Sequence, residues 1–522
     1  MPSYIFATTL FALLFVTSYL FAQENPLYSS KARFHPVVAK NAMVATENKY
    51  ATMAGLRVLK EGGNAVDAAV TIGFVMAVTY PRAGNLGGGG FMLTYISDKD
   101  EVVAIDYREK APLAATKDMF LDKEGNVDKN KSRNSILSAG VPGTVAGLSY
   151  ALEKYGTISL QRALAPAIEL AKNGFVVDYE LSKSLGQAKE QMEKSPASMK
   201  IFYKENGQPY KEGDLLVQKN LALSLEEISN NGPKAFYEGE IADKISEFMK
   251  DNDGLISKED LKKYSVAQRK PVKGNYRGYE IYSMPPPSSG GVHLVQMLNI
   301  LEQFPLPSYG QNTAKTINIL AETMKHAYAD RSKYLGDPDF NPIPLAELTS
   351  KDYAKSIKNE IKPGSAIPSI EIKPGDLSSY EGPNTTHFSV IDSDGNAVSN
   401  TYTLNFSYGS KITVPGTGIL LNNEMDDFSA KSGVPNAYGL VGGKLNSIEP
   451  EKRMLSSMSP TIVMKDNMPF LITGSPGGSR IITTVLQIIL NVVDFDMNIA
   501  EATNAARVHH QWLPDTLFVE KG

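Results

Sequence analysis

The spacing of hydrophobic and polar residues divides this chain into helical and strand-rich parts. Apolar residues recur at helical spacing over 51–60, and Gly-Gly-Asn at 62–64 ends that pattern before a long apolar run over 65–78. The run is too short to cross a bilayer, so we predict a buried helix. Residues 111–280 are richer in Lys and Glu and are predicted to be mostly helical.

The rest of the pattern predicts further strands, two more helices and an irregular segment. A strand over 279–284 leads into a stiff Pro- and Ser-rich turn and then a helix from Val292. Residues 335–383 are rich in Pro, Gly, Ser and charged residues, which is typical of a loop or disordered segment. The C-terminal part is strand-rich to about residue 474 and becomes helical over 481–490.

A β-hairpin is predicted over 384–403. Two runs of strand-type composition flank the sequence Asp-Ser-Asp-Gly-Asn at 392–396. If the first and last residues of this turn pair, they leave a three-residue loop in which Gly395 supplies the left-handed residue. The hairpin loop is therefore predicted at 393–395.

The register of this hairpin follows by counting outward from the loop. Ile391 is placed opposite Ala397, and Thr385 opposite Thr403, where two hydroxyl groups can hydrogen-bond. A slip of one residue would undo the pairing, and an ordinary Thr-rich hairpin explains the same composition.

Composition and charge are those of an ordinary globular protein. The 522 residues are 42% hydrophobic and 21% charged, with a net charge of -4 and a pI of about 6.0. Length alone suggests roughly two to four domains. No basic patch favours nucleic acid, and no block of like charge indicates a solvated tail.

The N-terminus predicts export. Residues 5–22 are almost wholly apolar, and the polar sequence Gln-Glu-Asn-Pro follows Ala22. We predict a signal peptide over 1–22 and a periplasmic protein, with release from the cell as an open alternative. A retained anchor is the other interpretation, because the apolar run approaches the length that spans a bilayer and the first four residues carry no Lys or Arg.

Cysteine is absent, which excludes disulfides, zinc-thiolate sites and Cys nucleophiles. The six histidines include only one close pair, at 509–510, and adjacent residues point to different sides of a helix or strand. We therefore predict no metal site. No Gly-Lys-Ser/Thr follows the four glycines at 87–90, so we expect them to let backbone approach backbone or substrate, not a nucleotide.

Six short motifs carry more specific information. They are Gly84–Phe91, Asp106–Glu109, Asn384–Ile391, Leu421–Phe428, Arg453–Thr461 and Thr473–Arg480. In this order they closely resemble the gamma-glutamyltransferases, which are N-terminal-nucleophile hydrolases, and the resemblance runs from about Pro36 to the last residue.

The resemblance implies a fold and a processing event. The fold is the α/β four-layer αββα sandwich, one domain shared by two subunits. Self-cleavage between Asn384 and Thr385 would give a large subunit, 23–384, and a small subunit, 385–522, which together form a heterodimer. Family members continue past this point, so we expect the chain to lack the natural C-terminus. No cofactor, nucleic acid or stable membrane association after signal removal is implied.

The resemblance also assigns the reacting groups. A Thr hydroxyl is a weak nucleophile that needs a base, and an α-amine with a pKa near roughly 7.7–8.0 is suited to that task. Thr385 would be the nucleophile and its own α-amine the base, and Thr403 would hydrogen-bond the hydroxyl. The N–H groups of Gly477 and Gly478, at a helix start, would form the oxyanion hole.

The γ-glutamyl group carries an α-carboxylate and an α-ammonium, and the family pattern assigns residues to each. They are Arg108, Ser456 and Ser457 for the carboxylate, Asn405, Glu424 and Asp427 for the ammonium, and Tyr438 of the lid loop 432–438. Arg can pair with a carboxylate through two parallel bonds. Some members have Gln where this chain has Glu424. Surface ion pairs, turn hydroxyls and a loop aromatic are the alternative explanations of these residues.

The function implied is cleavage of the γ-glutamyl amide bond of glutathione, glutamine and related compounds. The group would pass to Thr385 and then to water or to an acceptor amino acid or peptide. A related acylase, such as a cephalosporin acylase, or a capsule-processing transpeptidase is the alternative enzyme, although Arg108 with its serine pair favours a glutamyl group. An uncleaved, inactive relative acting as a binding protein is the alternative from another class.

Overall fold

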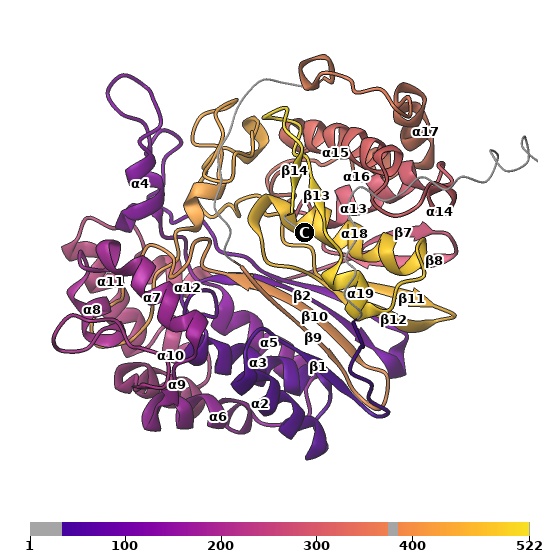
Figure 1. Ribbon diagram of the computed structural model, residues 1–522. Helices are drawn as coiled ribbons and strands as arrows, with labels where there is room; N and C mark the ends of the chain where they lie inside the picture. Colours follow the sequence, from indigo (N-terminus) through magenta and orange to yellow (C-terminus); the bar gives the residue numbers. More distant parts are fainter. Residues whose placement is uncertain (1–33, 374–384, 521–522) are drawn as a thin grey trace, which may run out of the picture.

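Two stacked antiparallel sheets form the centre of the molecule (Figure 1). The structure is a computed structural model that describes residues 34–373 and 385–520. Within these residues the larger sheet has six strands, in the order β1 (Met43–Ala45), β9 (Thr386–Ile391), β10 (Ala397–Thr403), β2 (Gly89–Ile96), β3 (Glu101–Tyr107) and β6 (Ala267–Arg269). The smaller sheet has four described strands, in the order β12 (Met468–Thr473), β11 (Thr461–Lys465), β8 (Tyr279–Ser283) and β7 (Val272–Tyr276).

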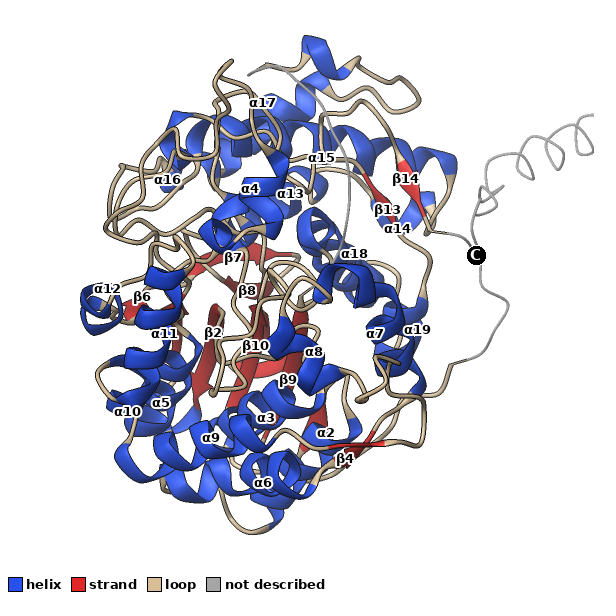
Figure 2. Cartoon of the chain, turned by 90° about the vertical axis from the view of Figure 1, so that its left-hand side faces the viewer, coloured by secondary structure: helices blue, strands red, loops and turns tan. Residues whose placement is uncertain are grey.

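Helices cover the outer face of each sheet, as Figures 1 and 2 show from two sides. The larger sheet is covered by α2 (Lys49–Lys60), α3 (Ala65–Thr79) and α5 (Thr144–Tyr155), while α6 (Leu160–Asn173) packs on α3 and α9 (Lys219–Asn231) packs on α6. The smaller sheet is covered by α13 (Gly290–Leu301), and α15 (Ala314–Tyr334), α17 (Lys351–Glu360) and α18 (Ile481–Val493) pack on α13. Strand β10 contacts β11 and β12 of the other sheet, so the two sheets pack face to face. This is the predicted αββα sandwich.

The described chain contains further helices and two small β-ribbons. The helices are α4 (Lys129–Asn134), α7 (Tyr179–Met192), α8 (Pro196–Phe202), α10 (Lys234–Tyr237), α11 (Glu240–Asp251), α12 (Lys258–Lys263), α14 (Leu306–Tyr309), α16 (Leu345–Leu348) and α19 (Ile499–Asn504). Two small ribbons pair β4 (Phe175–Val176) with β5 (Leu215–Leu216) and β13 (Val508–His509) with β14 (Phe518–Val519). The helical prediction for 111–280 holds for most of that range, while the helix predicted from Val292 begins at Gly290.

Helix α3 is the buried helix that the apolar run predicted. Every one of its residues is buried, and it packs against β9 and β10. Asn64 caps its N-terminus by accepting from the backbone N–H groups of Val66 and Asp67. The buried Asp67 carboxylate is satisfied by the N–H groups of Asn64 and Thr157, at 2.8 and 2.7 Å. A polar residue is therefore tolerated in this core because it completes a capping box.

The predicted hairpin register is confirmed. Ala397 pairs with Ile391, and the turn closes through a 3.1 Å bond from the N–H of Asp392 to the carbonyl of Asn396. Gly395 has a φ of +85°, the left-handed conformation that the loop requires. The ladder ends at the pair Thr386 and Tyr402, and the next step along it sets Thr385 opposite Thr403.

The prediction of a loop over 335–383 holds for most of its described part but is wrong for two helices. Helices α16 and α17 lie within it, and Ser350 caps α17 by accepting from the N–H of Tyr353 at 3.1 Å. Ala354 and Ile357 are buried and α17 packs against α13. The segment-wide composition hid this short amphipathic helix, because its polar face resembles loop composition. Residues 374–383 lie outside the described part of the chain.

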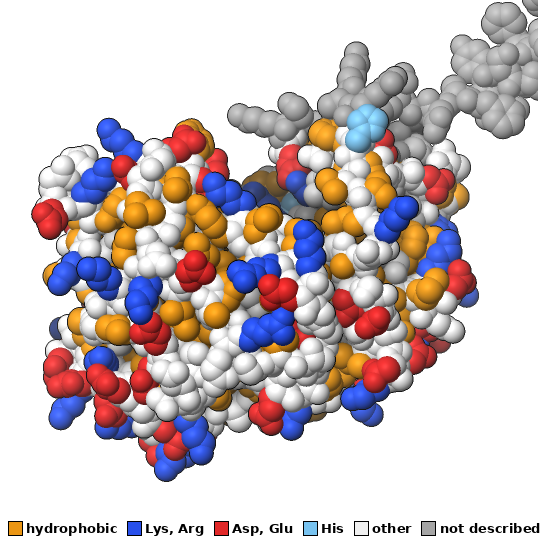
Figure 3. Space-filling model, turned by 90° about the horizontal axis from the view of Figure 1, so that it is seen from below, with side chains coloured by type: hydrophobic (Ala, Val, Ile, Leu, Met, Phe, Trp, Pro, Cys, Tyr) orange, Lys and Arg blue, Asp and Glu red, His pale blue; other side chains and the backbone are white. Residues whose placement is uncertain are grey.

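The surface and termini bear on the other sequence predictions. On the face in Figure 3, Lys and Arg are interspersed with Asp and Glu, with no area of a single sign of charge. In residues 34–373 and 385–520 no helix is both long and apolar enough to cross a membrane. The predicted signal peptide, 1–22, lies outside the described residues.

Candidate active site

One small cavity lies where β9 begins and β10 ends. All but one of the predicted site residues line it. The lining residues are Arg108, Thr385, Thr403, Asn405, Glu424, Asp427, Tyr438, Leu440, Ser456, Ser457, Met458, Gly478 and Ile481. Gly477, the exception, directly precedes Gly478. With a volume of about 20 Å³ the cavity has room for about one water molecule, so the site is closed in this structure.

The hairpin brings two threonines to this cavity. Thr385 is 7% exposed and Thr403 is 2% exposed, so both are buried. The Thr403 hydroxyl oxygen accepts the backbone N–H of Asn405 at 2.8 Å, and its carbonyl accepts the side-chain amide of Asn85 at 2.9 Å. The end of β10 is thus fixed from two sides, which gives Thr385 a rigid neighbour.

The four glycines at 87–90 permit close approach of backbone to backbone, one of the two roles expected of them. A Cβ on Gly87 would overlap the carbonyl oxygen of Leu420, and a Cβ on Gly88 would overlap that of Thr403. Gly90 faces the carbonyl of Thr401 in the same way. These contacts press the start of β2 against the end of β10, where the cavity lies.

Substitution of Gly88 by Ala will therefore destabilise the protein. The added methyl would overlap the Thr403 carbonyl and lie 2.8 Å from Oδ1 of Asn85, so backbone must move, at a cost of about 1–3 kcal/mol. Gly186→Ala is the matched control, because Gly186 is an exposed helical position with nothing near its missing Cβ, and there Ala should stabilise by about 1 kcal/mol. Urea unfolding of both variants measures the difference, and equal stabilities would contradict the close-approach role.

A glycine turn closes the opposite side of the cavity. Gly477 and Gly478 have φ of +131° and +54°, conformations that favour glycine, and a 3₁₀ turn over Gly478–Arg480 runs directly into α18. Within the described residues, neither glycine N–H donates to a protein acceptor. Two backbone donors at a helix start can stabilise an anion, as the sequence predicts.

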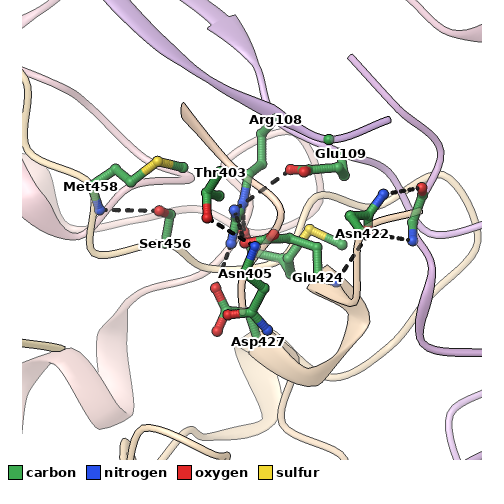
Figure 4. Close-up of polar contacts among 12 residues, drawn as sticks. Arg108, Glu109, Thr403, Asn405, Asn422, Glu424, Asp427, Ser456 and Met458 are labelled. Atoms are coloured by element: carbon green, nitrogen blue, oxygen red, sulfur yellow. Dashed lines mark hydrogen bonds and ion pairs between the residues drawn. The ribbon is translucent and has the colours of Figure 1, made fainter. Parts of the chain in front are cut away.

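Arg108 is the centre of a buried charge cluster (Figure 4). Its side chain is fully buried, so the surface ion-pair interpretation is wrong for this residue. One guanidinium nitrogen donates to Glu424, and Nη2 donates to Oδ2 of Asp427 at 2.5 Å. Oε2 of Glu109 lies 3.5 Å from Nη1. One guanidinium thus faces three carboxyl groups, two of which the sequence assigned to the substrate ammonium.

This cluster contains more negative than positive groups. Burial raises the pKa of Glu109 to about 7 and raises the pKa of Glu424 well above its ordinary value, although Arg108 opposes both shifts. Burial also raises the pKa of Asp427, again against Arg108. Burial thus disfavours the ionised form of all three carboxyl groups around Arg108, and a further cation in the cavity would favour their ionisation.

Tyr438, which the sequence analysis assigned to a lid loop, lines the cavity. Its hydroxyl donates to the Asn405 backbone carbonyl at 2.9 Å and also to the Asn405 side-chain oxygen. The ring lies against Gly478, where an added Cβ would be 2.5 Å from it. At 6% exposed, Tyr438 is buried, not a partly buried loop aromatic.

The serine pair is held by a second segment, the turn before α13. The N–H of Ser456 donates to the Pro287 carbonyl at 2.8 Å, and the Ser456 hydroxyl oxygen accepts from the N–H of Met458 at 3.1 Å. The Ser457 hydroxyl oxygen accepts from Nη2 of Arg331 at 3.2 Å. Turn contacts of this kind were the alternative explanation of the serines, and here they coexist with a place in the cavity wall.

Sequence reasoning missed three residues that shape this site. Glu109 belongs to the motif Asp106–Glu109, but the sequence assigned it no role. Asn422 was also quoted; its side chain donates to the carbonyls of Gly87 and Gly140 at 2.8 and 2.7 Å, tying two loops together. Arg331 lies in none of the six motifs. The feature that marks it is a positive charge on a helix whose residues around it are nearly all buried.

Comparison with known proteins identifies the family. The model of the gamma-glutamyltranspeptidase family matches residues 51–522. The chain belongs to this family. It is 58% identical over 490 residues to the glutathione hydrolase proenzyme of Escherichia coli, covering 94% of this chain and 84% of that protein. The resemblance seen in the motifs is confirmed, and the chain is an enzyme of the N-terminal-nucleophile hydrolase fold.

Solved structures of the family and its relatives agree with the fold. The gamma-glutamyltranspeptidase of Helicobacter pylori is 49% identical with a TM-score of 0.64, covering 67% of this chain and 100% of that one. The cephalosporin acylase of Bacillus halodurans is 28% identical with a TM-score of 0.81, covering 93% of this chain and 87% of that one. The same architecture therefore serves a transpeptidase and an acylase, so the choice between them rests on the site.

Proposed function

We propose that this chain is the precursor of a self-cleaving γ-glutamyltransferase whose nucleophile is Thr385. The observation that carries the proposal is the meeting of Thr385 with Arg108, the serine pair and Gly478 in one cavity. A hydroxyl nucleophile, an arginine for a carboxylate and a backbone donor for an oxyanion are the parts that γ-glutamyl transfer needs.

Processing comes first in the proposed sequence. The Thr385 hydroxyl attacks the carbonyl of Asn384, the amide becomes an ester as the Thr385 nitrogen leaves, and water hydrolyses the ester. The products are the large subunit, 23–384, and the small subunit, 385–522, which stay together because β9 and β10 of the small subunit lie between β1 and β2 of the large one. The Helicobacter pylori chain matches two thirds of this chain, close to the share that 23–384 represents.

Turnover then uses the newly released α-amine of Thr385. The amine accepts the hydroxyl proton as Oγ attacks the γ-carbonyl of the donor, and the N–H groups of Gly477 and Gly478 stabilise the oxyanion. The proton passes to the leaving amine, and a γ-glutamyl ester remains on Thr385. Water or the amine of an acceptor amino acid or peptide attacks that ester and restores the hydroxyl, with no cofactor required.

Substrate binding requires the charge cluster to open. The cavity is too small for a γ-glutamyl group, and the Arg108 guanidinium is engaged by Glu424 and Asp427. An α-ammonium drawn to these two carboxylates and to Asn405 would release donors of Arg108 for the α-carboxylate. The side chains would exchange partners, so each buried charge keeps a counter-charge throughout.

Glutathione and glutamine are the proposed donors, and the mature heterodimer is proposed to be periplasmic after removal of 1–22. The Escherichia coli relative is named a glutathione hydrolase proenzyme, which supports both the donor and the precursor. The apolar N-terminal stretch supports export.

An acylase is the second candidate, favoured by the likeness to the cephalosporin acylase. Comparing γ-glutamyl-p-nitroanilide with glutaryl-p-nitroanilide separates the two, because a glutaryl group lacks the ammonium and leaves Glu424 and Asp427 without a cation. We expect kcat/KM to favour the γ-glutamyl donor on the order of 100-fold or more. Equal or better use of the glutaryl donor would identify an acylase, and a single uncut band with no turnover would identify an inactive relative.

A further inference from the structure

We propose that Arg331 is a second cation of the α-carboxylate subsite and acts on the substrate through the hydroxyl of Ser457. The proposal rests on the proposed function and adds to it a positioning residue outside the six motifs. Arg331 lies on α15, is 4% exposed, and does not itself line the cavity.

The hydrogen bonds of Arg331 set the direction of the Ser457 hydroxyl. Nη2 of Arg331 donates to Oγ of Ser457 at 3.2 Å, and Nε donates to Oγ of Ser289 at 2.9 Å. A guanidinium only donates, so the serine oxygen is the acceptor and its own hydrogen must point elsewhere. Ser457 lines the cavity, so its O–H is available as a donor to an anion there.

Ser289 connects Arg331 to Ser456, the other member of the serine pair. Its N–H and its hydroxyl both donate to the carbonyl of Ser456, at 2.8 and 2.7 Å. Arg331 therefore fixes Ser457 directly and Ser456 through Ser289. Both members of the serine pair depend on one buried side chain.

The charges around the cavity favour an anion near Arg331. The Arg108 guanidinium is paired with Glu424 and Asp427, whereas no carboxylate lies within ion-pair distance of Arg331 in the described chain. The hydrogen-bond acceptors of Arg331 are neutral serines, and burial lowers its pKa to about 10 although Tyr328 and the more distant Asp427 oppose that shift. A substrate carboxylate at Ser457 would bring a negative charge closer to Arg331.

Helix α15 also links this subsite to the reacting centre. Tyr328 lies one turn before Arg331 on the same face, and its hydroxyl donates to the carbonyl of Ser479 in the glycine turn. One rigid helix thus holds both the serine pair and the proposed oxyanion hole. This arrangement fixes the distance between the bound carboxylate and the carbonyl under attack.

The test compares donors that keep or lack the carboxylate. Arg331→Met is assayed with γ-glutamyl-, glutaryl- and 4-aminobutyryl-p-nitroanilide, of which the last has no α-carboxylate. The kcat/KM ratio of the γ-glutamyl to the 4-aminobutyryl donor should fall roughly 10- to 100-fold, mainly through KM, and the glutaryl donor should lose as much as the γ-glutamyl donor. A merely structural role would lower all three alike and leave the ratio unchanged, which would overturn the proposal.

Controls keep the result decisive. Arg277→Met removes another arginine, which pairs with Asp494; neither residue lines the cavity, so the ratio should stay unchanged. If Arg331→Met does not fold, Arg331→Lys, which keeps the charge but not the fork, should show the same donor pattern to a smaller extent. Ser457→Ala must also lower the kcat/KM ratio of the γ-glutamyl to the 4-aminobutyryl donor. An equal fall of kcat/KM for all three donors in Ser457→Ala would also overturn the proposal. Failure of the wild-type protein to use the γ-glutamyl donor would instead refute the proposed function.

Discussion

Replacing Thr385 with Ala will abolish both processing and turnover. The hydroxyl is the attacking group in each step, and deletion of a catalytic nucleophile lowers kcat by on the order of 10⁶-fold in well-studied hydrolases. The fold should survive, because Thr385 lies one residue beyond the last pair of the β9–β10 ladder. A denaturing gel should show one uncut chain, and γ-glutamyl-p-nitroanilide turnover should be at background.

Two neighbouring variants give this experiment its control. Thr385→Ser keeps a hydroxyl at the same position and should still cut itself. Thr386→Ala removes the adjacent threonine, which lies on the strand, and should also be cleaved. A new N-terminus at position 385 in the Thr385→Ala protein would contradict self-cleavage and indicate an external protease.

Replacing Arg108 with Lys will weaken donor binding severely while leaving cleavage intact. Lys cannot reproduce the planar fork that contacts Glu424 and Asp427 here and that we propose contacts the substrate carboxylate. Loss of a desolvated charge pair costs roughly 2–5 kcal/mol, which corresponds to about 30- to 5,000-fold in kcat/KM. Steady-state kinetics on the processed variant measure this loss.

Arg269→Lys is the matched control for Arg108. Arg269 forms two bonds to Asp339, at 3.0 and 2.7 Å, and lies outside the cavity. The Arg269→Lys variant should lose the paired guanidinium contact with Asp339, and its kcat/KM should change little. Near-wild-type kinetics of Arg108→Lys would remove Arg108 from the carboxylate subsite, and loss of self-cleavage would give it a structural role in the precursor.

The hairpin illustrates what the sequence could predict. Its loop, its register and the position of Thr385 follow from composition, from Gly395 and from counting, because strand geometry has a period of two and the turn fixes the starting point. The buried helix α3 was equally predictable, since an uninterrupted apolar run after Asn64 leaves few alternatives.

Other parts of the site depend on contacts between distant segments. The pairing of Arg108 with Glu424 and Asp427 joins positions more than three hundred residues apart, and no local pattern indicates that these groups bind one another before a substrate does. Arg331 is harder still, because a single charge on α15 has meaning only once the serine pair is placed beside it. The helix α17 was missed because its short amphipathic pattern lies within polar surroundings.

The central claim is that Thr385 becomes an N-terminal nucleophile carrying the γ-glutamyl group. Intact-mass spectrometry of the purified wild-type protein, quenched with acid during turnover of a γ-glutamyl donor, tests it most directly. We predict two chains, the smaller beginning at Thr385, with part of it heavier by one glutamyl group that fragmentation places on Thr385. A single uncut chain, or an adduct on any other residue, would contradict the account.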